Sequence, residues 1–153
     1  MRHDKSRTAA GALTNLASSQ PGKGQKLLWV DDSRPLLELY KTVFESLGFE
    51  VQATCSPHEA LDHLSSQATD MAILDYEMPE INGGVLAALI KGRHPELPVI
   101  LYSGSLRIPQ AAHRWVDAIC SKAAPREELL ATIEETLGHG AYAAASSSIR
   151  AFA

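Results

Sequence analysis

Cysteine is scarce in this sequence, and long apolar runs are absent. The two cysteines, Cys55 and Cys120, lie far apart and show no CxxC spacing, which favours reduced thiols over a disulfide or a zinc site. No stretch approaches the roughly 20 apolar residues that a membrane-spanning helix needs. The mildly apolar segment over residues 8–19 is interrupted by polar residues, unlike a secretory signal. We therefore expect a cytoplasmic protein without a membrane partner.

The sequence also lacks an excess of basic residues. Its formal net charge is −4, so no general positive field draws it to a polyanion, and we expect no nucleic-acid partner. The six histidines show no metal-ligand spacing, and we assign them no chemistry. What the chain does have is 45% hydrophobic residues over a length of 153, which suits one domain with a full core.

Composition divides the chain into three parts. Serine, glycine and proline near residue 20 predict a flexible N-terminal tail over residues 1–25. Residues 26–138 form the expected domain. Residues 139–153 are rich in alanine and serine and predict a frayed C-terminal tail without an output domain.

Apolar runs and helical stripes alternate through residues 26–138. Strands are expected at residues 26–30, 49–54, 71–74, 98–102 and 117–121. Helices are expected after the cap residues Ser33 and Ser56, from about Gly84, from about Pro109 to Trp115, and from Arg126 to Leu137. Five such repeats predict an α/β fold: a doubly wound, five-stranded parallel sheet with five helices and right-handed crossovers.

The apolar positions of these helices give the expected core. Leu36 and Leu39 belong to the stripe of the first helix, and Val85 and Leu89 are expected to face inward with the rest of the third helix. Trp29 is also expected in the core, and Trp115 either in the core, which we favour, or on a surface for a partner.

Polar residues of selected kinds stand where several strands end. The run Met71–Leu74 leads directly into Asp75, and the other strand ends carry Asp31-Asp32, Ser103 and Lys122. If the strand order is 2-1-3-4-5, the first and third strands are neighbours, and the three carboxylates converge beyond the carboxyl edge of the sheet.

Such a cluster suits Mg²⁺, which prefers oxygen ligands and also grips phosphate oxygens. A metal beside Asp75 would keep this carboxylate ionised as a nucleophile, while Ser103 and Lys122 supply a hydroxyl and an ammonium to phosphoryl oxygens. Taken singly, the same residues have simpler interpretations: Asp31-Asp32 as a helix cap, Ser103 as a turn former and Lys122 as a solvated side chain. Their joint occurrence favours the site.

From Lys26 to Leu137 the sequence resembles a response-regulator receiver domain (CheY-like) of two-component signal transduction. The resemblance rests on Asp31-Asp32, the segment Leu74–Pro79 with the following Gly83, Ser103-Gly104, and Lys122. It implies a flavodoxin-like fold and a phosphoryl group accepted on Asp75 from a histidine kinase or histidine phosphotransfer protein. It also implies Mg²⁺ held by Asp32, Asp75 and the main-chain carbonyl of Glu77, and by Asp31 through water. A change in protein–protein binding at the face of the fourth helix, fifth strand and fifth helix would carry the signal.

The sequence departs from the family pattern in three places. Ala123-Ala124 separate Lys122 from Pro125, whereas proline usually follows this lysine directly, and Ile119 occupies the usual aromatic switch position. Glu77 places a carboxylate two residues beyond Asp75. Our hypothesis is that Glu77 and Ser105 tune how long the phosphoryl group survives.

Two other functions remain open. One is a phosphorylation-independent binding module that keeps the receiver fold but does not switch. The other is a phosphatase with an aspartyl nucleophile, for which Glu77 has the spacing of the second acid; the Asp31-Asp32 pair and the lack of a cap insertion argue against it. We therefore expect that the protein is not an enzyme and that it catalyses only its own phosphorylation and dephosphorylation.

Overall fold

The central element is a five-stranded parallel sheet. The computed structural model describes residues 22–105 and 107–151, with side chains as far as Gly138. The strands are β1 (Lys26–Val30), β2 (Glu50–Thr54), β3 (Met71–Leu74), β4 (Val99–Ser103) and β5 (Ala118–Ser121). Their order in the sheet is β2-β1-β3-β4-β5, and every neighbouring pair is parallel. The predicted flavodoxin-like topology is confirmed.

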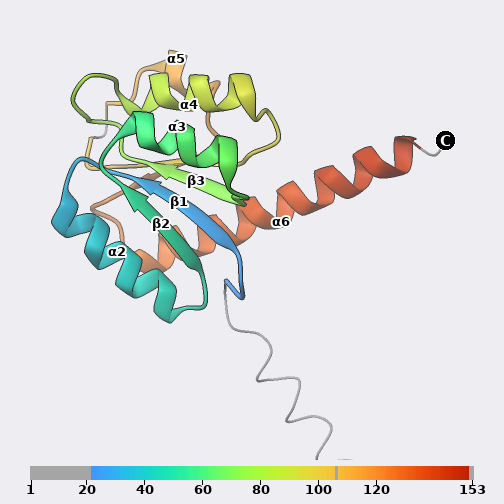
Figure 1. The fold of residues 1–153 in the computed structure, drawn as a ribbon, viewed down its shortest axis with the longest axis horizontal. Helices are drawn as coiled ribbons and strands as arrows, with labels where there is room; N and C mark the ends of the chain where they lie inside the picture. The colour runs from blue at the N-terminus through green and yellow to red at the C-terminus, as the bar shows by residue number, and fades with distance from the viewer. Residues whose placement is uncertain (1–21, 106, 152–153) are drawn as a thin grey trace, which may run out of the picture.

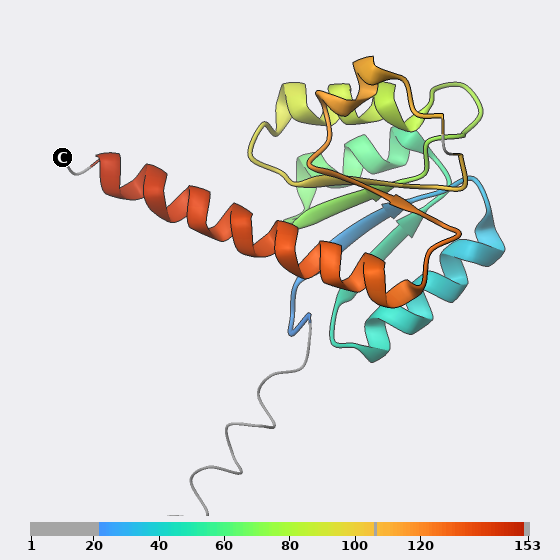
Figure 2. The ribbon, with the colours of Figure 1, turned by 180° about the vertical axis from the view of Figure 1, so that it is seen from behind.

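Five helices cover the two faces of the sheet. They are α2 (Arg34–Ser46), α3 (Pro57–Ser66), α4 (Gly83–Arg93), α5 (Gln110–His113) and α6 (Arg126–Ala151). Helices α2 and α6 lie on one face, and α3, α4 and α5 lie on the other (Figures 1 and 2). Because both faces are covered, the strands are continuous apolar runs, as in β3, where all four residues are buried.

The face covered by α2 and α6 contains an aromatic cluster. Trp29 stacks on Tyr40 with ring centroids 4.7 Å apart and meets the edge of Phe44 at 5.0 Å. Tyr102 lies 5.5 Å from Tyr40 and 6.0 Å from Trp29. Such pairs stabilise a core by about 0.5–1.5 kcal/mol each beyond the burial of their area. The expectation that Trp29 belongs to the core is confirmed.

Local capping explains where several helices begin and end. The Ser56 hydroxyl accepts a hydrogen bond from Glu59 N, and the Asn82 side chain accepts one from Val85 N. Ser33 is the N-cap of α2, although its side chain makes no capping bond. Gly48 follows α2 with φ of 97°, a conformation that glycine adopts without strain.

Four apolar side chains expected inside lie at the surface. Val85 and Leu89 of α4 are 45% and 42% exposed, Trp115 is 36% exposed, and Leu39 of α2 is 51% exposed. The core positions expected for Leu39, Val85 and Leu89 are therefore wrong, and Trp115 takes the surface position that was the alternative to the core. The physical reason in α4 is that the sheet buries the stripe of Leu86 and Ile90, while α5 is a single turn and too short to cover the next stripe.

The last helix is longer than the sequence suggested. A frayed end was expected after residue 138, but α6 continues to Ala151 and extends beyond the sheet (Figure 1). Its 26 residues give a length of about 39 Å. Alanine is the strongest helix former, and the alanine-rich composition after Gly140 favours this continuation. None of the described helices has the combination of length and hydropathy needed to cross a membrane.

Few described residues bear on the predictions for the N-terminal end of the chain. Strand β1 begins at Lys26, where the domain was expected to start, and Gly22–Gly24 form a turn before it. The predicted tail over residues 1–25 lies almost entirely outside the described residues.

Candidate functional site

The predicted site residues stand at the carboxyl edge of the sheet because each follows or ends a strand. Asp31 follows β1, Asp75 follows β3, Ser103 ends β4, and Lys122 comes directly after β5. Backbone hydrogen bonds continue the sheet at these positions: Asp75 N donates to Val30 O at 2.8 Å, and Lys122 N donates to Ser103 O at 2.9 Å. The sheet register therefore fixes where these side chains start.

Three carboxylates meet at this edge. Asp31, Asp32 and Asp75 each offer an oxygen, and these oxygens lie within 4.8 Å of one another. Asp31 is 1% exposed and Asp75 is 6% exposed, whereas Asp32 is open to solvent. The backbone N–H of Ser33 donates to Asp31 at 2.9 Å and fixes that carboxylate. The cluster is thus buried on one side and accessible on the other.

Lys122 is the cation that faces this cluster. Its ammonium donates a hydrogen bond to Asp31 at 2.6 Å and lies 3.3 Å from an oxygen of Asp75. The side chain is 19% exposed, so the pair is only partly screened by water. One ammonium opposite three carboxylates leaves a local excess of negative charge.

The pKa values of Asp75 and Lys122 reflect this arrangement. Burial raises the pKa of the Asp75 carboxyl, the nearby Lys122 opposes this, and Asp31 adds to it. Burial lowers the pKa of the Lys122 ammonium, but its hydrogen bond to Asp31 and the charges of Asp31 and Asp75 together raise it above its ordinary value. An ionised Asp75 therefore gains from any further positive charge at this edge.

The donor set fits a hard divalent cation. Mg²⁺ takes carboxylate oxygens and water, and it tolerates an open position for a further oxygen ligand. Two buried carboxylates and one exposed carboxylate, with charge that Lys122 does not balance, match that preference. The Glu77 side chain is exposed in the loop between β3 and α4.

Ser103 and Ser105 are joined by a hydrogen bond. Ser103 is 1% exposed, and its hydroxyl oxygen accepts from Ser105 N at 3.1 Å. The Ser105 hydroxyl oxygen in turn accepts from Arg107 N at 3.2 Å. These bonds shape the loop that leads from β4 toward α5. Ile119 is half-buried and packs in the core on the face of α3, α4 and α5.

Gly83 has a specific structural role beside Asp75. A Cβ atom built at Gly83 would lie 2.2 Å from the carbonyl oxygen of Asp75, and the N–H of Gly83 donates to Tyr76 O. The first residue of α4 therefore packs directly on the backbone of Asp75. The sequence showed a glycine after the Pro79 turn, but nothing in the sequence revealed this contact.

Sequence reasoning placed Trp29 in the core but did not place aromatic side chains beneath the site. Side chains alternate along a strand, so Trp29 points to the same face as Asp31, two residues later. Tyr102 and Tyr40 complete that layer, and burial raises the pKa of both hydroxyls, with Asp31 and Asp75 adding to the rise at Tyr40. Because side chains two residues apart share a face of a strand, the position of Asp31 could have predicted that Trp29 lies beneath the site.

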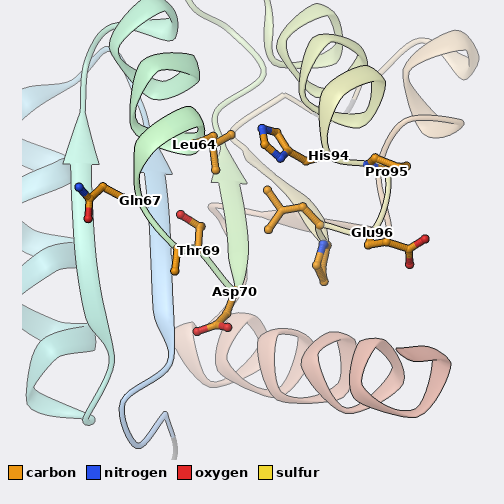
Figure 3. Close-up of a pocket in the computed structure, with 10 residues that line it drawn as sticks. Leu64, Gln67, Thr69, Asp70, His94, Pro95 and Glu96 are labelled. Carbon is orange, nitrogen blue, oxygen red and sulfur yellow. The ribbon is translucent and has the colours of Figure 1, made fainter. Parts of the chain in front are cut away.

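A large hollow lies elsewhere in the described part of the chain. It has a volume of about 530 Å³ and lies at the opposite edge of the sheet, between the ends of α3 and α4 (Figure 3). Its lining includes Leu64, Thr69, Asp70, His94 and Glu96, and none of the predicted site residues. This hollow would therefore not have identified the carboxylate cluster.

Fold and site together define the class. A parallel sheet in the order 2-1-3-4-5, with a carboxylate cluster and a lysine at its carboxyl edge, is the arrangement of flavodoxin-like proteins of the CheY type. A family model of the response regulator receiver domain matches residues 27–134. The chain belongs to the receiver domain family of two-component systems.

Curated relatives match over part of their length. The C4-dicarboxylate transport transcriptional regulatory protein DctD of Rhizobium meliloti is 37% identical over 88 residues, which are 58% of this chain and 19% of DctD. Response regulator SaeR of Staphylococcus aureus is 36% identical over 74 residues, 48% of this chain and 32% of SaeR. The chain therefore spans less than a third of the length of either relative.

Solved receiver structures have the same fold. The response regulator TrrA of Thermotoga maritima, solved in complex with Mg(2+)-BeF, is 26% identical with a TM-score of 0.70, over 73% of this chain and 98% of TrrA. NtrX of Brucella abortus, in complex with ATP, is 25% identical with a TM-score of 0.75, over 81% of this chain and 29% of NtrX.

Proposed function

We propose that this receiver domain is a phosphoacceptor switch in which Asp75 takes a phosphoryl group from a phosphohistidine. The donor is a histidine kinase or a histidine phosphotransfer protein. A carboxylate oxygen of Asp75 forms the new O–P bond while the N–P bond of the donor breaks, and the departing imidazole takes up a proton. The convergence of Asp31, Asp32 and Asp75 opposite Lys122 is the observation that carries this proposal.

Asp31, Asp32 and Asp75, with the main-chain carbonyl of Glu77, would hold Mg²⁺. Bound there, the ion supplies positive charge that keeps Asp75 ionised and screens the incoming phosphoryl oxygens. The raised pKa of Asp75 supports this assignment, because burial alone disfavours the ionised nucleophile. A solved receiver of similar sequence, TrrA, is in complex with Mg(2+)-BeF.

Lys122 and Ser103 would stabilise the phosphoryl group once it is on Asp75. The Lys122 ammonium already lies 3.3 Å from Asp75 and bonds to Asp31 at 2.6 Å, so it is close to the oxygen that would carry the phosphoryl group. The Ser103 hydroxyl accepts a bond from Ser105 N, which leaves its proton for a phosphoryl oxygen. Phosphoryl transfer depends mainly on such positioning and charge stabilisation.

The signal would be a change in what the domain binds. Ile119 replaces the aromatic side chain expected at the switch position, so the face of α5, β5 and α6 would change its binding without an aromatic rotamer. Glu77 and Ser105, at the rim, would set how long the phosphoryl group survives.

A small phosphodonor with Mg²⁺ separates the candidate functions. Intact-mass spectrometry is expected to show one phosphoryl group per chain, lost in Asp75→Asn and retained in the matched control Asp62→Asn, which alters an exposed carboxylate of α3. Steady release of phosphate without a stable adduct would indicate a phosphatase instead. Absence of any adduct in the wild-type protein would indicate a phosphorylation-independent binding module.

A further inference from the structure

Three of the four exposed large apolar side chains lie on the same part of the described surface. They are Val85 and Leu89 of α4 and Trp115, which follows α5. A groove of about 330 Å³ runs between α4 and α5, with Val85 and Ala88 on one wall and Ala111 and Trp115 on the other. Apolar surface of this kind, left uncovered in a folded domain, marks an interaction site.

The groove is formed before any partner arrives. Gly84 lets α5 approach α4 closely, because a Cβ atom at Gly84 would lie 2.9 Å from the Cβ atom of Ala112. The side chain of Asn82 caps α4 at the same end. The close packing of α5 on α4 therefore fixes the shape of the groove. A partner would bind without the entropic cost of ordering these two helices.

The two segments that wall the groove carry only basic charges, whereas the loop before α4, which adds Tyr76 and Asn82 to the lining, contains the exposed Glu77 and Glu80. The chain has a net charge of −4, yet neither α4 nor the segment from Gly104 to Val116 contains an acidic residue. Arg93 lies one turn after Leu89, while Arg107 and Arg114 flank the short α5. Among the ion pairs of the described residues, none involves Arg93, Arg107 or Arg114.

Arg114 lies against the ring of Trp115 at the groove. Its guanidinium lies 5.2 Å from the centre of the Trp115 ring, a cation–π contact. Tryptophan and arginine are the residue types that most often dominate binding energy in protein interfaces. An apolar floor with a basic rim favours a ligand that has an apolar side and an acidic side, and a nucleic acid would leave the apolar walls uncovered.

We propose that the groove between α4 and α5 binds an acidic amphipathic helix of a partner protein. Aliphatic or aromatic side chains at i, i+3/i+4 and i+7 of that helix enter beside Trp115 and Val85, and its carboxylates meet Arg93, Arg107 and Arg114. This surface shares α5 with the expected face of α5, β5 and α6 but lies on the α4 side of that helix, and its use does not require a phosphoryl group on Asp75.

The test is a selection from two helical peptide libraries, using the full chain in the unphosphorylated state. Both libraries have randomised apolar residues at i, i+3, i+4 and i+7; one has glutamate and the other lysine at the exposed positions. Enrichment is expected only from the glutamate library. Amide chemical shifts of the full chain should then change at α4 and α5 when a selected peptide is added.

Variants locate the binding. Trp115→Ala and the charge reversal Arg114→Glu are each expected to weaken binding by about tenfold or more, as hot-spot residues do. Leu39→Ala is the matched control, because Leu39 is an exposed leucine of α2, the helix that covers the other face of the sheet. Arg114→Glu changes an exposed side chain, so a folding defect would not explain its effect.

Several results would overturn the proposal. These are enrichment from the lysine library, no enrichment from either library, and selected peptides that bind Trp115→Ala and Arg114→Glu as tightly as the wild-type protein. Self-association that Trp115→Ala abolishes would assign the groove to a second copy, and sedimentation with anionic vesicles would assign it to a lipid surface.

Discussion

The ammonium of Lys122 lies 2.6 Å from the buried carboxylate of Asp31, although 91 positions separate them along the chain. The same ammonium is 3.3 Å from Asp75, so one cation holds acids from two strands together. This pairing predicts how the protein responds when the lysine is removed.

Replacing Lys122 with methionine should destabilise the domain when Mg²⁺ is absent. The change leaves Asp31 and Asp75 buried without a counter-charge, which costs about 3 kcal/mol in comparable pairs. Urea unfolding followed by circular dichroism measures the loss, and added Mg²⁺ should recover more stability in Lys122→Met than in the wild-type protein. Lys41→Met, which removes a half-exposed pair with Glu45 and a hydrogen bond to Val51 O, should cost only about 1 kcal/mol. Equal losses in both variants would contradict the assignment.

Gly83→Ala should destabilise the fold although alanine favours helix. Its new Cβ atom would lie 2.2 Å from the Asp75 carbonyl oxygen, so the backbone of the site must move. Forcing a methyl group into such a contact costs about 1–3 kcal/mol. Gly92→Ala on the same helix is the control, because its Cβ atom meets nothing within 4 Å, and it should gain up to about 1 kcal/mol. Thermal unfolding of both variants decides the point, and a stabilised Gly83→Ala would refute the close packing.

Stability should fall at alkaline pH because of Tyr40. Burial raises the pKa of its hydroxyl, with contributions from Tyr102 and Asp31, so the folded protein keeps a proton that the unfolded chain releases above about pH 10. The contribution is fully present below the unfolded pKa and is lost as pH rises above it. Between pH 10 and 11 the free energy of unfolding of the wild-type protein should fall more steeply than that of Tyr40→Phe, by up to about 1.4 kcal/mol per pH unit. Urea unfolding at several pH values gives this free energy for both proteins. If it falls equally with pH in the wild-type protein and in Tyr40→Phe, Tyr40 is not the cause.

Glu77→Asn should lengthen the lifetime of the phosphorylated protein. Glu77 is an exposed carboxylate two residues beyond Asp75, where it would take a proton from the attacking water, and asparagine lacks that ability. Loss of the phosphoryl group after removal of the donor measures the rate. The exposed Glu96, at the opposite edge of the sheet, provides the control Glu96→Gln. A rate that Glu77→Asn leaves unchanged would reject the tuning role.

Much of the fold and site followed from the sequence because both depend on strands. Short apolar runs ending in polar residues identified all five strands, and parallel geometry then brought Asp31 and Asp75 to one edge. Helix surfaces were predicted less well. The exposure of Val85 and Leu89 depends on the length of the neighbouring α5. The spacing of apolar residues within α4 does not predict that length. The pairing of Lys122 with Asp31 depends on side-chain torsions, and the contact of Gly83 with Asp75 depends on the entry angle of α4. Neither leaves a pattern along the chain.

The measurement closest to the central claim is a calorimetric titration of the domain with Mg²⁺, because everything proposed for Asp75 requires that it share a cation with Asp31 and Asp32. We expect one ion per chain, with affinity reduced by about tenfold or more in Asp31→Asn and in Asp75→Asn, and unchanged in the exposed control Asp62→Asn. Binding that both site variants leave intact, or no binding at millimolar Mg²⁺, would contradict the account.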